Sequence, residues 1–223
     1  MSDKIIGSLN EHTLHLSLKK YIEPDPAFHE VEYGPFVADI KHGNCICEIE
    51  TTSFTRMKKK LEFFLDENEV TVVYPITVKK WVAYIDPKTG KVSERRRSPV
   101  KERASDVCFE LFKIKEYIGH PNFVLKLVFI EELNYKRRKG KRSSVSEERI
   151  PLSFISEMTF VEKCDYALLC DAIPDGDFTA KEFEKANKLH GGSCWYLLQI
   201  LLSASVIEKV GKNGNAFVYR RLN

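Results

Sequence analysis

Hydrophobic and polar residues alternate along the first fifty residues with two different spacings. Over residues 11–22 the apolar residues recur at the spacing of one helix face, which predicts an amphipathic helix. The Glu-Pro-Asp-Pro segment at residues 23–26 ends this helix, because proline lacks a backbone donor and restricts the residue before it. Residues 28–40 alternate as in a strand, residues 42–44 indicate a turn, and residues 45–50 predict a second strand.

The middle of the chain continues as a mixture of helices and strands. Ser53 is a candidate N-cap for a helix that carries Lys58 and two further lysines. The other elements that the spacing predicts here are strands at residues 70–76, 79–85 and 122–133 and a helix at residues 103–118. Residues 1–155 are therefore expected to form one domain of the α/β class, with a mixed central sheet flanked by helices.

The C-terminal part has a different order of elements. A helix at residues 162–173 is followed by a second helix, for which Thr179 and Glu182 form a capping-box pattern, and by a third helix that starts near Ser193. Two strands around an Asn-Gly turn then end the chain. Helices followed by a basic hairpin are typical of winged helix-turn-helix domains, so residues 156–223 are expected to form one.

The predicted hairpin at residues 36–50 brings three acidic residues together. If Gly43-Asn44 is the whole loop, Asp39 lies directly opposite Glu48, and Glu50 shares their face of the ribbon. Like charges that face each other across two strands destabilise a sheet, so this arrangement needs a reason. A divalent cation is one reason, since Mg²⁺ binds proteins through carboxylate oxygens, and a solvated acidic face is the alternative.

The same residues resemble the core motif of the PD-(D/E)xK nuclease superfamily. In that motif an acid such as Asp39 follows an apolar strand, and Glu48-Ile49-Glu50 after a turn precedes a lysine-bearing helix. Glu50 stands where these nucleases usually have lysine, so the motif is similar to the E-x-E variant of some restriction enzymes and to CoiA-like proteins. Glu11 resembles the helical glutamate that completes many such sites. With the segment Val73-Tyr74-Pro75-Ile76 and the tail, nearly the whole chain looks like an uncharacterised prokaryotic family that joins this core to a winged helix.

The resemblance implies a restriction-endonuclease-like fold and metal-dependent hydrolysis of phosphodiester bonds in DNA. Asp39, Glu48 and the carbonyl of Ile49 would hold Mg²⁺ or Mn²⁺, which orients a water molecule, lowers its pKa and stabilises the reacting phosphorus. Glu50 would hold or deprotonate that water, or recruit a second metal ion. The expected activity is therefore that of a DNA endonuclease.

The missing lysine leaves several alternatives open. Lys58 or Lys19 could supply the displaced positive charge, and Glu30 and Glu32 are alternative fourth acids that otherwise serve as surface residues. The histidines near the hairpin have no metal-binding spacing, and His15 is expected to pack or hydrogen-bond within the first helix. Two functions compete with the nuclease: a DNA-binding regulator that keeps the nuclease fold without its activity, and a protein-docking module.

Charge is clustered, although the formal net charge is only +3. A run of six cations within residues 136–142 predicts contact with the DNA backbone, whereas a solvated loop has equal weight for the run at residues 95–97. The predicted nucleic-acid contacts are Lys136, Arg137, Arg138, Lys139, Lys141 and Arg142 in the longer run, and Lys212 and Arg220 in the C-terminal hairpin. The third C-terminal helix is expected to face DNA, with docking to protein, including a homodimer, as the equal alternative.

Composition indicates where the protein is found. The chain has no apolar run near the roughly 20 residues of a membrane helix, and its first residues lack the apolar core of a signal peptide. A cytoplasmic location without membrane contact is therefore expected. The six cysteines include no CxxC pair and are expected to be free thiols.

Overall fold

The computed structural model describes residues 12–140, 143–189 and 192–222, so Glu11, Lys141 and Arg142 lie outside the described residues. Its main sheet is mixed, with the order β1-β2-β3-β4-β6-β7 and with β5 paired to β4. The strands are β1 His29–Tyr33, β2 Phe36–His42, β3 Cys45–Ile49, β4 Glu69–Ile85, β5 Arg96–Arg97, β6 Phe123–Arg138 and β7 Ser144–Phe160. β4 runs parallel to both β3 and β6, and the other pairs are antiparallel. The expected α/β class, with a mixed central sheet and flanking helices, is confirmed.

Helices cover both faces of this sheet. They are α1 His12–Ile22, α2 Lys58–Phe64, α3 Cys108–Leu111 and the 3₁₀ turns η1 Pro26–Phe28, η2 Phe54–Met57, η3 Ala104–Val107 and η4 Phe112–Tyr117. Leu18 of α1 belongs to one buried cluster with Val73, whereas Leu61 of α2 belongs to a second buried cluster with Val72. Successive residues of β4 thus serve opposite cores, because side chains alternate across a strand.

The β2–β3 hairpin has the register that the sequence predicts. His42 pairs with Cys45, so Gly43-Asn44 is the whole loop, and Gly43 adopts a φ of +58°. Left-handed backbone of this kind suits glycine, which has no Cβ to clash. The single strand predicted at residues 28–40 is wrong, however, because a turn at Gly34, with a φ of +60°, divides it into β1 and β2.

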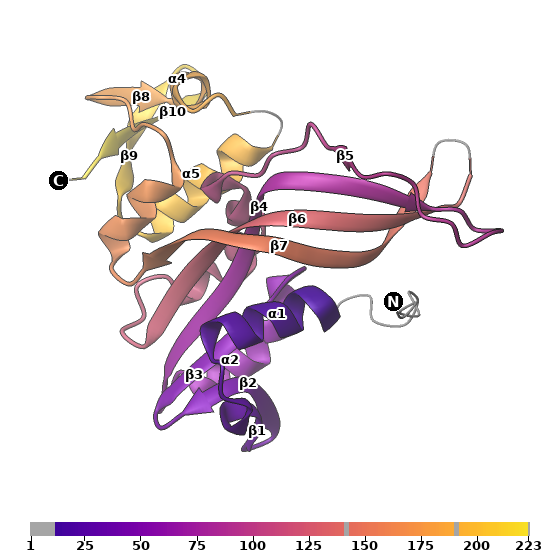
Figure 1. Ribbon diagram of the computed structural model, residues 1–223. Coiled ribbons are helices and arrows are strands. Elements are labelled where there is room, and N and C mark those ends of the chain that lie inside the picture. Colours follow the sequence, from indigo (N-terminus) through magenta and orange to yellow (C-terminus); the bar gives the residue numbers. More distant parts are fainter. Residues whose placement is uncertain (1–11, 141–142, 190–191, 223) are drawn as a thin grey trace.

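Three long strands form an arm that projects from the body of the molecule. β4, β6 and β7 run side by side past α1, and β5 follows the outer edge of β4 (Figure 1). The two strands predicted at residues 70–76 and 79–85 are one strand with an irregularity between Thr77 and Lys79. β6 also continues beyond its predicted end at residue 133, so Lys136, Arg137 and Arg138 lie in a strand paired with β7.

The C-terminal part adds a small three-stranded sheet and two helices. Its elements are η5 Lys163–Leu169, β8 Asp177–Thr179, α4 Ala180–Ala186, α5 Ser193–Ser203, β9 Ile207–Asn213 and β10 Ala216–Arg221, and its sheet has the order β8-β10-β9. The predicted capping box is confirmed at α4, where the Thr179 hydroxyl accepts from the backbone N–H of Glu182 and the Glu182 carboxylate accepts from that of Thr179.

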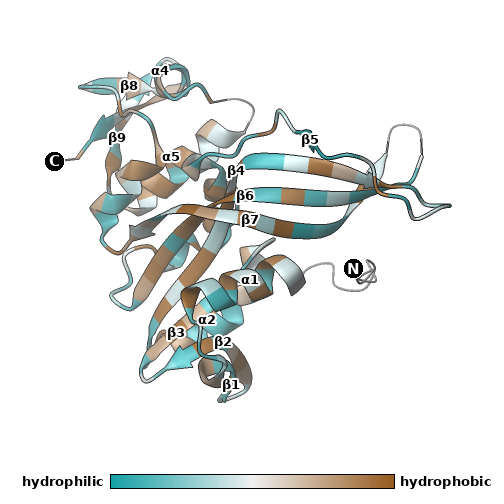
Figure 2. Cartoon of the chain, viewed as in Figure 1, coloured by the Kyte–Doolittle hydropathy of each residue, from teal (hydrophilic) through white to brown (hydrophobic). Residues whose placement is uncertain are grey.

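The C-terminal part shares a continuous hydrophobic core with the main sheet. Phe160 at the end of β7, Tyr166 in η5 and Leu197 in α5 belong to the same buried cluster as Val72 in β4. α5 consists mostly of hydrophobic residues (Figure 2) and packs against α3 and η4. β7 runs through residue 155, where the sequence suggested a domain boundary, and ends at Phe160.

Two expectations about composition can be compared with the described residues. The six cysteines are all free thiols, as expected. Within the described residues, no helix has the length and apolar character needed to cross a bilayer.

Candidate functional site

A cleft of about 350 Å³ opens where α1, the β2–β3 hairpin and the start of α2 meet. Asp39, Glu48 and Glu50, the three acids that the sequence singled out, line it together. The cleft is also lined by His15, Glu30, Ile49, Arg56 and Lys60. The structure therefore brings the predicted acidic residues into one site.

The carboxylates of Asp39 and Glu48 are locked together through the backbone. The pairing of β2 with β3 ends at Ile40 and Cys47, and beyond this pair the Asp39 and Glu48 side chains bond to the backbone of the facing segment. Asp39 Oδ2 accepts a hydrogen bond of 2.8 Å from the backbone N–H of Ile49. Glu48 Oε1 accepts one of 3.1 Å from the backbone N–H of Asp39. The hairpin thus holds both carboxylates in fixed positions at the base of the cleft.

The two carboxyl groups differ in their acidity. Burial and the nearby charge of Asp39 raise the pKa of Glu48 to about 7, against the opposing effect of Lys60. Burial would also raise the pKa of Asp39, but hydrogen bonding and charge from His15, the Ile49 amide and the charge of Lys19 lower it overall. Asp39 is therefore the group with the stronger preference for its charged form.

Lys60, the third lysine of α2, supplies a positive charge that the sequence did not locate. Its Nζ donates to Glu48 Oε2 at 2.7 Å and to the backbone carbonyl of Val37 at 2.8 Å. Lys58, the predicted candidate, instead pairs with Glu116 at 3.1 Å, where both side chains are about half exposed. The prediction for Lys58 is wrong because α2 turns that residue toward η4 and away from the cleft.

Helix α1 contributes two further basic side chains to Asp39. Lys19 is 1% exposed, and its Nζ lies 3.7 Å from Asp39 Oδ1 and pairs with Glu30. His15, one helical turn earlier, places Nε2 at 3.2 Å from Asp39 Oδ2. The expectation that His15 packs or hydrogen-bonds within its own helix is wrong, because it bonds to Asp39 of β2. The alternative prediction for Lys19 places that residue correctly beside the acids.

Glu30 lines the cleft, although the sequence suggested it only as an alternative fourth acid. It adopts a φ of +53°, a left-handed conformation that is strained for a residue with a side chain. Its carboxylate pairs with the buried Lys19 ammonium. Glu32, the other alternative acid, is exposed on β1 and lies outside the cleft lining.

Glu50 is held by the loop that follows it. Its Oε1 accepts from the backbone N–H groups of Thr51 and Thr52 at 2.9 Å and of Ser53 at 3.2 Å, and from the Thr52 hydroxyl at 3.0 Å. Among the described residues Ser53 makes no side-chain cap, and the backbone N–H of Phe54, the first residue of η2, donates instead to Glu110 Oε2 at 3.0 Å. One oxygen of Glu50 is therefore committed to ordering the entry to η2.

The donor set can be compared with what Mg²⁺ requires. No group of three or more His, Cys, Asp or Glu side chains is arranged for a metal ion within the described ranges. Asp39 and Glu48 supply two carboxylates, and Ile49 lies beside them. Among the described residues Asp39 Oδ1 accepts no hydrogen bond, and each oxygen of Glu48 accepts one and keeps a second lone pair. Mg²⁺ binds through one or two carboxylates and keeps several waters, so this pair fits it without a third acid.

The predicted nucleic-acid residues fall on two separate surfaces. Lys136, Arg138 and Lys139 lie toward the tip of the arm, with Arg137 paired to Glu147. In the C-terminal sheet, Arg220 forms two hydrogen bonds to Asp177, at 2.6 and 3.1 Å. Lys212 lies 4.9 Å from the centre of the Phe217 ring in the exposed β9–β10 hairpin. The arginines of both pairs are thus partly neutralised by their acids.

Comparison with known proteins places most of the chain in one family. The model described as "Domain of unknown function (DUF8091)" matches residues 12–161. The chain belongs to the DUF8091 family. An "Uncharacterized protein" of Treponema pallidum (strain Nichols) is 26% identical over 224 residues, which cover 97% of this chain and 87% of that protein. No solved structure matches the chain.

The DUF8091 match includes every described residue of the cleft. It begins at the first residue of α1 and ends at residue 161, next to the last residue of β7. The elements from η5 to β10 therefore lie outside the match, although they share a core with it.

Proposed function

We propose that this protein is a metal-dependent deoxyribonuclease whose site is the cleft around Asp39 and Glu48. The observation that carries the proposal is the pair of carboxylates that each accept a backbone N–H from the opposite side of the hairpin, with Lys60 Nζ at 2.7 Å from Glu48. This pair supports the resemblance to PD-(D/E)xK nucleases, because their lysine need not follow the second acid directly if another lysine reaches the same place.

Each residue of the cleft has a role in this proposal. Asp39, Glu48 and the carbonyl of Ile49 would hold Mg²⁺ or Mn²⁺, which when bound supplies a Lewis acid and an activated water. Lys60 would stabilise negative charge on the phosphate, as positioned cations do for transferring phosphoryl groups. The exposed Arg56 on the cleft wall would bind a neighbouring phosphate.

The state of Glu50 favours a second candidate function. A general base needs a carboxylate that is free to take a proton, whereas Glu50 Oε1 accepts four hydrogen bonds from its own loop. This observation supports a DNA-binding regulator that keeps the nuclease fold without its activity. In that case the cleft would be structural, and the arm and the C-terminal part would carry the function.

A winged helix remains our proposal for the C-terminal part. It is supported by the strand order β8-β10-β9, with α4 and α5 between β8 and β9, and by Lys209 and Lys212, which flank Phe217 in the exposed hairpin. The N-terminal half of α5 packs Trp195 on Phe112 at 4.9 Å between ring centres, so the hairpin is a better candidate for DNA contact than this helix.

Plasmid cleavage tests the proposed activity. Supercoiled DNA incubated with the protein and Mg²⁺ or Mn²⁺ should be nicked or linearised, and Glu48→Ala should abolish this. Glu32→Ala is the matched control, because it removes an exposed acid on β1 outside the cleft. No cleavage by the wild-type protein, together with retained DNA binding, would support the regulator instead. Equal activity of wild type and Glu48→Ala would reject this site.

A further inference from the structure

The arm carries an excess of positive charge along one edge. Residues 79–101 contain eight lysines and arginines and two acids, a net charge of +6, whereas the whole chain has only +3. The rest of the protein is therefore net acidic, although residues 136–142 carry six further cations. This run lies outside the basic residues 136–142 and outside the cleft.

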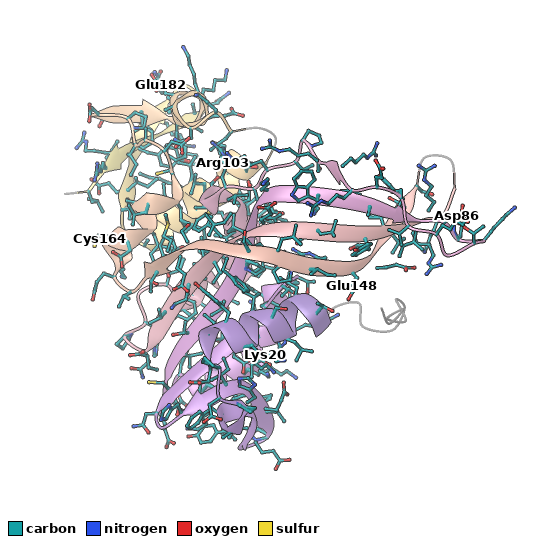
Figure 3. The ribbon with its side chains drawn as sticks, viewed as in Figure 1. Lys20, Asp86, Arg103, Glu148, Cys164 and Glu182 are labelled. Atoms are coloured by element: carbon teal, nitrogen blue, oxygen red, sulfur yellow. The ribbon has the colours of Figure 1, made fainter. Side chains whose placement is uncertain are left out.

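The chain after β4 returns along that strand as a strap, which we define as residues 91–101. Backbone hydrogen bonds fix it: Ser93 N–H donates to the Tyr84 carbonyl at 2.9 Å and Ser98 N–H to the Lys80 carbonyl at 2.8 Å. Between them β5 pairs with β4 through Arg96 and Arg97. The strap follows the outer edge of the arm (Figure 1), and Asp86 marks the tip where it turns back (Figure 3). Its cations are thus held in a fixed row.

Two aromatic rings orient the guanidinium groups of this row. Arg96 and Arg138, from β5 and β6, lie 5.1 and 5.0 Å from the centre of the Tyr84 ring. Arg95 lies 5.0 Å from the centre of the Trp81 ring. All three arginines are exposed, and within the described part of the chain none has a carboxylate at ion-pair distance. Arg96 also donates to the Tyr84 hydroxyl at 3.1 Å. Stacking therefore holds the three charges in place without neutralising them.

A basic hollow continues the row toward the body of the molecule. It has a volume of about 380 Å³ and is lined by Lys79, Lys80, Arg97 and Lys101, together with the chain at residues 98–100. Lys79 and Lys80 pair with acids of β6 at 2.9 and 3.3 Å, whereas Arg97 and Lys101 have no such partner among the described residues. Free cations thus extend along the strap from Arg95 to Lys101.

We propose that this arm edge, formed by the strap with Tyr84 and Arg138, binds the phosphate backbone of duplex DNA. The choice of polyanion rests on the proposed function. A duplex fits better than a single strand, because proteins that bind single strands stack bases on open aromatic rings. Here the faces of Tyr84 and Trp81 are occupied by cations. A spaced row of guanidinium groups matches phosphates, which fix position on a duplex without reading its sequence.

Fluorescence anisotropy with a short labelled duplex, without divalent metal, tests this proposal. The variant Arg95→Gln/Arg96→Gln/Arg97→Gln should bind more weakly, and its slope of log affinity against log salt should flatten by up to ~2.7 for three lost phosphate contacts. Arg138→Gln should flatten it by up to ~0.9. A single strand of the same sequence should show a smaller loss of affinity in the triple variant.

A matched variant separates a local surface from overall charge. Lys20→Gln/Lys59→Gln/Lys163→Gln removes the same charge from exposed positions outside the arm. An equal loss of duplex affinity in this control, or an unchanged salt slope in the arginine variant, would overturn the proposal. So would an equal or larger loss for the single strand, or a loss confined to vesicles of anionic lipid.

The same assay distinguishes this proposal from the proposed nuclease. Binding is measured without divalent metal, so it is read apart from cleavage, and the cleft is not part of the arm edge. If no cleavage occurs but binding depends on the strap, the nuclease fails and the arm edge stands. If cleavage occurs and binding does not depend on the strap, the arm edge fails alone.

Discussion

Replacing Lys60 by methionine tests the cleft most directly, because it removes the ammonium group while retaining most of the aliphatic stem. In the wild-type protein that ammonium joins Glu48 Oε2 to the Val37 carbonyl. The Glu48 side chain is 4% exposed and that of Lys60 is 27% exposed. The substitution therefore leaves a nearly buried carboxylate without its cationic partner.

The expected loss of stability follows from this burial. Removing one member of a fully buried ion pair costs about 3–5 kcal/mol. Because Lys60 is partly exposed, water can reach Glu48, and a cost of about 2 kcal/mol is more reasonable. For a chain of this length that corresponds to a fall in Tm of roughly 4–8 °C. Plasmid cleavage should fall by about 10²–10³-fold if the ammonium stabilises the reacting phosphate.

Lys58→Met is the matched control on the same helix. The ion pair of Lys58 with Glu116 is about half exposed on both sides, so its loss should change the free energy of unfolding by under ~0.5 kcal/mol and leave cleavage unchanged. Thermal unfolding and plasmid nicking of both variants give the comparison. Equal effects of the two substitutions, or no effect of either, would refute the role assigned to Lys60.

Three further predictions concern other parts of the fold. In metal-free protein, the raised pKa of Glu48 makes the folded state bind its proton more tightly than the unfolded state, so stability should fall as pH rises from about 4.5 to about 7. Thermal unfolding should show this slope weakened in Glu48→Gln, and an identical slope would contradict it. Gly34→Ala should lower Tm more than Gly43→Ala: both have positive φ, but only at Gly34 does the added Cβ clash with the Phe63 ring. Thr179→Ala removes the N-cap of α4 and should cost about 1 kcal/mol in chemical denaturation, with an unchanged midpoint as the opposing result.

Local signals in the sequence were sufficient for the hairpin and for α1. The Gly-Asn loop sets the register, so the approach of Asp39 to Glu48, just beyond the last pair Ile40–Cys47, follows from counting along two strands. β7 gave no comparable signal, because its residues do not alternate cleanly between apolar and polar types. It forms by pairing with β6 over most of its length, a contact that depends on the three-dimensional arrangement.

The position of Lys60 in the cleft could not be predicted from the sequence alone. Met57 at the end of η2 and Leu61 and Phe64 in α2 form a buried stripe, and Lys58 and Lys60 flank it on opposite sides. The helical period thus reduces the candidates for the lysine beside the acids from three to two, Lys58 and Lys60. Which of the two faces the acids depends on how α2 lies on the sheet, and the sequence of α2 does not contain that orientation.

The two lysines beside the acids differ in their freedom to move, and this difference separates the candidate functions. The Lys19 side chain is 2% exposed and tied to Glu30, so its charge is a fixed part of the cleft that offsets Asp39. Lys60 is 27% exposed and reaches Glu48 from the rim. A cation that binds both carboxylates would compete with Lys60 and leave Lys19 in place. In a nuclease, Lys60 would then turn toward the phosphate, whereas in a regulator it would remain on Glu48 as a structural ion pair.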